Sequence, residues 1–202
     1  MNALERREAL FSEIHKAALK PRGHFKKGHW SIRSEAPFHW TVHVHASQYS
    51  DRSRTGFSLE ALIFHEGWYS LTQDRPFPGV TDTSYAIGEN LGEHCAPSLK
   101  RIEVLDDTDV APLLSALIGA VEQFALPLFA QCSSLPGMLA YYEQRPDLPQ
   151  VAHAAAGVCL LMKRDEDAMR YMQMAKAAAP NDKARAWLQM KQRAMWSKSV
   201  TA

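Results

Sequence analysis

The sequence predicts an α+β fold: an antiparallel sheet of about four strands, packed by an N-terminal helix and a long central helix. Three observations predict this fold. Apolar and polar residues alternate over residues 38–47, FHWTVHVHAS, which is typical of a strand with one buried face. Over residues 2–19 and 110–125, apolar residues instead recur at helical spacing. Alanine-rich helical spacing in residues 148–197 predicts a C-terminal helical hairpin that extends the fold.

Three further segments are predicted as strands. A short turn joins residues 29–34 to residues 38–47, so these two segments should pair as an antiparallel hairpin. Residues 56–65 and 99–105 supply the other two strands. Residues 66–97 are rich in proline and glycine and predict a long loop, with at most a short strand at GWYSLTQ.

The second half of the chain is predicted to be helical. Asp109 or Thr108 can cap the helix at residues 110–125, and Pro127 should break or kink it before helix resumes through residue 130. A short helix follows at residues 135–144. Three segments after it are also predicted as helices: 148–162, 165–179 and 182–197.

A domain boundary is predicted at Arg145-Pro146-Asp147, because this polar, proline-containing turn separates the mixed segments from the helical ones. It divides the chain into an α+β domain, residues 1–145, and a C-terminal helical extension, residues 146–202. A chain of 202 residues is long enough for a sizeable core in such a domain.

The C-terminal spacing resembles a tetratricopeptide repeat when Pro180 is placed at the closing proline of the repeat. Met172 then falls on its large apolar position, but Ala152 and Cys159 stand where the repeat usually has aromatic residues. A helical hairpin that is rich in alanine for packing reasons alone explains the pattern equally well. The small positions of the repeat are occupied by Ala156, Ala168 and Ala175.

Composition and charge narrow the class of protein. The formal net charge is +1, so the strong basic excess of a nucleic-acid-binding protein is missing. The three cysteines are far apart and have neither zinc-ribbon nor thioredoxin spacing, which indicates free thiols in a reducing compartment. The N-terminus does not resemble a signal peptide, and no apolar run approaches the roughly 20 residues of a membrane span. We therefore expect a cytoplasmic protein.

Four motifs follow one another in the first two thirds of the chain: LKPRGHFKKGHWSIR, FHWTVHVHASQYS, FSLEALIF and LKRIEVLDDTDVAPLL. With these motifs, residues 5 to about 145 resemble the domain-of-unknown-function family numbered 4304. His24 is an extra residue relative to the family pattern. The resemblance implies an α+β fold and brings no catalytic residues. Small proteins of this general kind often act as bacterial immunity or inhibitor proteins, which is an argument by association only.

The central strand carries the most unusual surface in the sequence. Because side chains alternate across a strand, one face of residues 38–47 meets the core and the other face carries three histidines. We expect this second face to be open and to be the binding surface of the protein. Its candidate residues are His39, Thr41, His43, His45, Ser58 and Glu60.

A metal site is the alternative interpretation of the same strand. His43 and His45 are two imidazoles on one face and can bind one ion, with Glu60 of the neighbouring strand opposite them. A strand face that simply tolerates histidine explains the pattern without any metal. Our preferred prediction is therefore that the protein has no metal ligands and no cofactor.

Catalytic constellations find little support in the sequence. Cys95 follows His94 on a predicted loop, but chain neighbours do not form a dyad, and Ser133-Ser134 lack a nucleophile elbow. The segment GENLGEH lacks the strand and lysine of a phosphate-binding loop. The basic residues near Phe25 and Trp30 are most simply a solvated turn, with these two rings anchored in the core.

These observations predict a non-catalytic protein-binding module, with an immunity or inhibitor protein against a bacterial toxin as the specific form. We expect the chain to bind another protein and to bind neither nucleic acid nor a membrane. The alternatives are a metal-dependent enzyme or metal-binding protein that uses the strand histidines, and an assembly module whose helical tail binds a peptide or a second copy.

Overall fold

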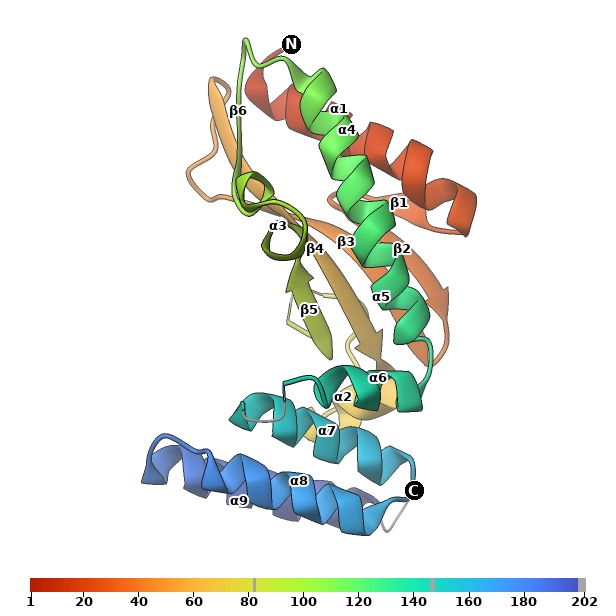
Figure 1. Cartoon of the computed structure of the whole chain (residues 1–202), viewed down its shortest axis with the longest axis vertical. Coiled ribbons are helices and arrows are strands. Elements are labelled where there is room, and N and C mark those ends of the chain that lie inside the picture. Colours follow the sequence, from red (N-terminus) through yellow and green to blue (C-terminus); the bar gives the residue numbers. More distant parts are fainter. Residues whose placement is uncertain (82, 146–147, 200–202) are drawn as a thin grey trace. The chain divides into compact units, whose positions relative to one another are not determined.

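The computed structural model of the chain is shown in Figure 1 and describes residues 1–81, 83–145 and 148–199. The fold is α+β, as predicted, with six strands in one open antiparallel sheet where about four were expected. Contacts divide the chain into two compact units. The first comprises Met1–Ile63 with Ile87–Phe129, and the second comprises Phe64–Ala86 with Ala130–Ala202.

This division differs from the predicted boundary at residues 145–147, of which residues 146 and 147 lie outside the described part of the chain. The short helix after the sheet, α6 (Leu135–Tyr142), groups with the C-terminal helices rather than with the sheet. Residues 64–86, which begin with the last two residues of a strand, also belong to the helical unit. The helical unit is therefore assembled from two separate stretches of sequence.

The sheet of the first unit has the strand order β1-β2-β3-β4-β5, and β6 also pairs with β4. The longest strand, β4, pairs with β5 through Glu60–Ile63 and with β6 through Arg54–Phe57, so its two halves have different neighbours. The strands are β1 (Phe25–Lys27), β2 (Trp30–Glu35), β3 (Phe38–Ala46), β4 (Arg54–His65), β5 (Ile87–Asn90) and β6 (Ile102–Leu105).

The predicted hairpin of residues 29–34 and 38–47 is present as β2 and β3, which pair in antiparallel register from Trp30↔His43 to Glu35↔Phe38. An additional short strand, β1, precedes it. Gly28 has a φ of +57° in the turn between β1 and β2, a conformation that glycine adopts without steric cost. All three residues of β1 are exposed, so it lacks the apolar alternation that would have predicted it.

The helices of the first unit cover one face of the sheet. Figure 1 shows α1 and α4 laid across the same side of the strands. His15 reaches Ser31 of β2, with Nδ1 2.8 Å from Oγ, and the Lys26 ammonium of β1 lies over the Phe11 ring. The helical segments are α1 (Ala3–Ile14), the π-helical turn η1 (His15–Leu19), the 3₁₀ turns η2 (Lys20–Arg22) and η3 (Pro97–Leu99), α3 (Leu91–His94), α4 (Val110–Ala120), the π-helical turn η4 (Val121–Ala125) and α5 (Leu126–Gln131).

The long central helix passes Pro127 without breaking. The π-helical turn η4 ends two residues before this proline, and α5 continues to Gln131. A π-helical turn shifts the hydrogen-bond pattern by one residue, which lets a helix accommodate a proline that cannot donate. Asp109 caps the start of α4, because its side chain accepts a hydrogen bond of 3.1 Å from the amide of Ala111.

This helix corrects one sequence expectation. Val110–Gln131 is a 22-residue segment that contains an 18-residue window with a mean hydropathy of 1.7, so by length and composition it is apolar enough to cross a membrane. A mostly buried core helix of a soluble protein passes the same test; here 33% of the window is buried, including Leu117, Ala120 and Val121, and a single helix of this kind says little. The segment is therefore weak evidence for a membrane span, and the cytoplasmic location stays a prediction.

Residues 66–73 are helical, so the expectation of a loop or short strand there is wrong. In α2 (Glu66–Gln73) the His65 side chain accepts a hydrogen bond of 3.1 Å from the amide of Trp68 and caps the helix. Trp68, Tyr69 and Leu71 are buried against the second unit's core. The segment is too short for its helical spacing to stand out beside its aromatic residues, which favour a strand.

The predicted C-terminal helices are present within the described residues. They are α7 (Pro149–Leu161), α8 (Asp165–Ala177) and α9 (Asp182–Ser199). Ala156, Ala168 and Ala175, together with Met172, are fully buried, which confirms that these small residues serve helix packing. A Cβ atom on Gly157 would lie 2.8 Å from the Thr72 side chain, so α7 and α2 approach very closely at that point.

Candidate functional site

The face of the sheet opposite the helices carries the predicted histidines. Residues directly opposite each other in antiparallel strands share a face. The register therefore places Trp30 beside His43, and Phe25 and Ile32 beside Thr41. We call this surface the histidine face and define it by eight residues: Phe25, Trp30, His39, Thr41, His43, His45, Ser58 and Glu60.

The histidine face is only partly open, so the expectation of an exposed row of side chains is wrong at two positions. Thr41 is fully buried, and His43 is only 8% exposed. The reason at His43 is its neighbour on β2, because the Trp30 ring lies almost parallel to the imidazole, with 3.8 Å between ring centroids and 16° between planes. His45 is exposed, and Glu60 is half-buried.

The two remaining predicted residues, His39 and Ser58, are half-buried. His39 lies near the start of β3, and its Nδ1 is 2.9 Å from Oγ of Ser34 on β2. The register pairs the same two residues, so this is a cross-strand contact within the face. His39 is thus on the predicted face but outside the group of residues around Glu60.

His43, His45 and Glu60 come together as the metal interpretation required. One ligand atom of each lies within 4.8 Å of the corresponding atoms of the other two. The Glu60 carboxylate lies between the two imidazoles: Oε2 is 3.5 Å from His43 Nδ1, and Oε1 is 3.9 Å from His45 Nδ1. The two imidazole rings are almost perpendicular, at 87°. These residues are the ones on this face that could hold a metal ion.

The Nδ1 atom of His43 is buried and makes no hydrogen bond within the described residues. Its 3.5 Å distance to Glu60 allows at most a loose ion pair, because hydrogen bonds from nitrogen to oxygen are shorter and better aligned. Most buried polar atoms in proteins are hydrogen-bonded, so an exception needs an explanation. The Thr41 hydroxyl on the same face is also buried without such a partner.

Two aromatic residues of the face lie elsewhere than the sequence analysis predicted. Phe25 was expected to anchor a turn in the core, but it is 52% exposed on the edge strand β1. Trp30 is half-buried, and it covers His43 rather than entering the core beneath the helices. The position of Trp30 opposite His43 follows from the β2–β3 register, and the alternation of β3 alone gives no sign of it.

The cysteines do not form a nucleophilic site within the described residues. His94 does not face Cys95, because its Nε2 is 2.6 Å from the Glu89 carboxylate and its ring stacks on Phe124. Burial raises the pKa of the Cys95 thiol, and it raises the pKa of Cys132 to about 12. All three cysteines are free, as predicted, and a thiol with a raised pKa is a poor nucleophile.

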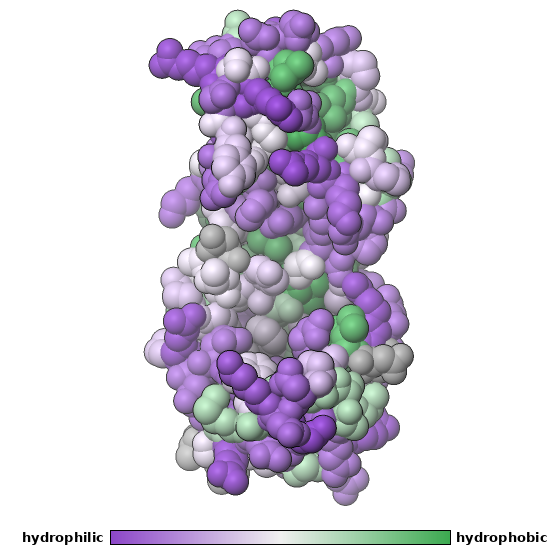
Figure 2. All heavy atoms as spheres, turned by 90° about the vertical axis from the view of Figure 1, so that its left-hand side faces the viewer, coloured by the Kyte–Doolittle hydropathy of each residue, from purple (hydrophilic) through white to green (hydrophobic). Residues whose placement is uncertain are grey.

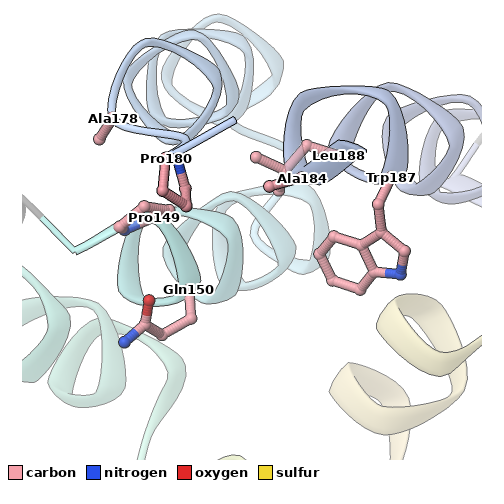
Figure 3. Close-up of a pocket in the computed structure, with 7 residues that line it drawn as sticks. All are labelled: Pro149, Gln150, Ala178, Pro180, Ala184, Trp187 and Leu188. Atoms are coloured by element: carbon pink, nitrogen blue, oxygen red, sulfur yellow. The ribbon is translucent and has the colours of Figure 1, made fainter. Parts of the chain in front are cut away.

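A pocket in the second unit is shown in Figure 3. It has a volume of about 360 Å³ and lies between the start of α7, the end of α8 and α9. Pro149 and Pro180 lie side by side at one end, the Trp187 ring lies at the other, and the Gln150 amide points away. The pocket is apolar and offers no polar group that would select a ligand, so we assign it no function.

The chain was compared with family models, with curated proteins and with solved structures, and no match was found in any of the three. The resemblance to the family numbered 4304 therefore stays a prediction from the sequence motifs.

Proposed function

We propose that the protein is a non-catalytic binding module for another protein, and that the exposed part of the histidine face contacts the partner. Phe25 carries the proposal. It is a phenylalanine left 52% exposed on the side of the sheet opposite α1 and α4 of its unit. Exposed aromatic rings on an otherwise polar surface are typical of the centres of protein interfaces.

Other residues on the same face of the sheet fit the same purpose. Lys27 shares its strand and face, and Trp30, His45 and Glu60 add a half-buried ring and two ionisable groups. Such a mixture of aromatic and charged side chains suits a partner with both apolar and polar groups at its surface. The face of the molecule shown in Figure 2 is mostly hydrophilic with separate small apolar patches, which is the ordinary state of a protein surface.

The experiment that tests this proposal is affinity capture from the native host with matched variants. Phe25→Asp places a charge in the proposed contact, and Tyr49→Asp makes the same kind of change at a residue that is 79% exposed outside the histidine face. The proposal expects a protein that co-purifies with the wild type and with Tyr49→Asp, and that is lost with Phe25→Asp. Equal recovery with both variants, or no specific protein with the wild type, would contradict it.

A bacterial toxin is the narrower proposal for the partner, and it rests on the family resemblance alone. Co-expression tests it directly. A toxin encoded beside this gene should arrest growth when expressed alone, and growth should be restored by the wild type but not by Phe25→Asp. Continued arrest in the presence of the wild type would exclude that toxin as the partner.

A further inference from the structure

We propose that His43, His45 and Glu60 form a binding site for a divalent transition-metal ion of the zinc class. This site would add a bound ion to the proposed binding face, and it does not depend on whether a protein partner docks there.

The donor set selects the class of ion. Two imidazole nitrogens and one carboxylate oxygen suit zinc, cobalt, nickel, copper and iron. Magnesium and calcium prefer sites built entirely from oxygen ligands. A site of two histidines and one glutamate with further positions open is a known zinc arrangement, in which water or another ligand completes the coordination.

The spacing of the donor atoms is close to that of a bound ion. Neighbouring ligand atoms in a tetrahedral zinc site lie about 3.4 Å apart, given zinc–nitrogen bonds of about 2.0 to 2.1 Å. His43 Nδ1 is 3.5 Å from Glu60 Oε2, His45 Nδ1 is 3.9 Å from the other carboxylate oxygen, Oε1, and one donor atom of each residue lies within 4.8 Å of the other two. The side chain of His45 is 62% exposed, so it is free to close the remaining distance by a small rotation.

The missing hydrogen bond at His43 is the independent observation. A buried nitrogen that makes no hydrogen bond loses its hydration without full compensation, at a cost of about 1 to 3 kcal/mol. A metal ion coordinated by Nδ1 would remove this deficit. Since Glu60 lies beside the same atom, the carboxylate would also offset the positive charge of the ion.

Trp30 supports the geometry from the opposite side. Its ring packs on the His43 imidazole and restricts the rotation of that ring, so one ligand is fixed before any ion arrives. His43 and Glu60 sit on neighbouring strands of the sheet rather than on loops, which also limits their movement. The exposed His45 side chain leaves the site accessible from solvent.

Calorimetric titration of zinc chloride into the metal-stripped full chain tests the proposal, with magnesium chloride as the control ion. We expect one zinc ion per chain and no binding of magnesium. His45→Ala and Glu60→Gln should each weaken zinc binding by more than about tenfold, because each removes a direct ligand. Both positions are at least partly exposed, so these variants should fold, and circular dichroism checks that they do.

His39→Ala is the matched control, since it removes a histidine from the same strand and face without touching the cluster. Unchanged zinc affinity in this variant, together with the losses at His45 and Glu60, would support the site. Absence of zinc binding would overturn the proposal and leave the cluster as a loose ion pair. Equal affinity in the wild type, His45→Ala and Glu60→Gln would also overturn it, because other histidines would then hold the ion.

Discussion

Buried imidazoles lie on both faces of the β2–β3 pair, and the two faces differ in the hydrogen bonds that these imidazoles make. On the helix-covered side, His15 and His24 both contact Ser31: His15 Nδ1 is 2.8 Å from its hydroxyl, and His24 Nδ1 is 3.2 Å from its carbonyl oxygen. On the histidine face, His43 is equally buried, but its Nδ1 makes no hydrogen bond within the described residues. Burial with a partner is ordinary packing, whereas burial without one needs an explanation. At His43 the explanation we propose is a bound ion, because Glu60 and His45 lie beside the same atom.

The largest expected effect is the loss of stability when a residue of the helix-covered face is truncated, compared with the same change on the histidine face. Trp40 is 4% exposed on the helix-covered face, so Trp40→Ala should lower the free energy of unfolding by about 3 to 5 kcal/mol. Phe25→Ala, which truncates an exposed ring on the histidine face, should change it by less than about 0.5 kcal/mol. Urea unfolding of the full chain measures both values. Similar losses in the two variants would show that the histidine face is also a core face.

Zinc should stabilise the wild type through the histidine face. At a zinc concentration about 100 times Kd, the free energy of unfolding should rise by about 2.7 kcal/mol, because the ion binds only the folded chain. His45→Ala should show no such gain under the same conditions. Thermal unfolding with zinc and with a chelator measures the difference. A gain of equal size in both proteins would place the ion elsewhere.

Much of the architecture could be predicted from local pattern. The alternation of residues 38–47 identified β3, and helical spacing located α1, α4 and the three C-terminal helices. The failures are short elements, such as β1 and β5, which have three and four residues and therefore too few positions to establish a period. The segment at α2 failed because aromatic residues favour a strand, while the His65 cap and its buried side chains make it a helix.

The candidate site could be predicted only in part, because a local pattern fixes the face of a strand on which a residue lies but not its neighbour on the next strand. Alternation places His43 and His45 on one face, and a neighbouring strand brings Glu60 opposite them. Alternation does not say which side chain of the next strand covers a given residue, because that depends on the register. The burial of His43 beneath Trp30 is a consequence of the β2–β3 register, which no local pattern in the sequence specifies.

The helix-covered side should respond to pH through His24. Burial lowers the pKa of its imidazole from 6.5 to about 4, so the folded chain keeps it neutral while the unfolded chain protonates it. The contribution of His24 to the free energy of unfolding is fully present above pH 6.5. It is lost as the pH falls toward 4, by up to about 1.4 kcal/mol per pH unit.

The free energy of unfolding should therefore depend less steeply on pH in His24→Asn than in the wild type, between pH 6.5 and pH 4. Asparagine keeps a hydrogen-bond donor at this position but cannot be protonated. His153 of the second unit, whose pKa burial lowers to about 4, and His15, whose pKa is lowered by burial and by the nearby Lys26 and Lys20, should contribute to the slope that remains. An identical slope in the wild type and in His24→Asn would contradict the neutral buried state of His24.

A small effect is also expected at Thr41. Its hydroxyl is buried and makes no hydrogen bond within the described residues, so Thr41→Val removes a polar group and leaves a side chain of similar shape. Replacing such a group should change the free energy of unfolding by less than about 1 kcal/mol, and the change can be a gain. Urea unfolding measures it. A loss of several kcal/mol would show that the hydroxyl does have a partner.

The most direct test of the central claim is to record the imidazole nitrogen resonances of the full chain by NMR while zinc is added. The claim is that the unpartnered nitrogen of His43 marks a metal site. It predicts that the Nδ1 resonances of His43 and His45 shift together, while those of His15 and His24, which are held by Ser31, stay in place. Movement of other histidines with His43 unchanged would contradict it.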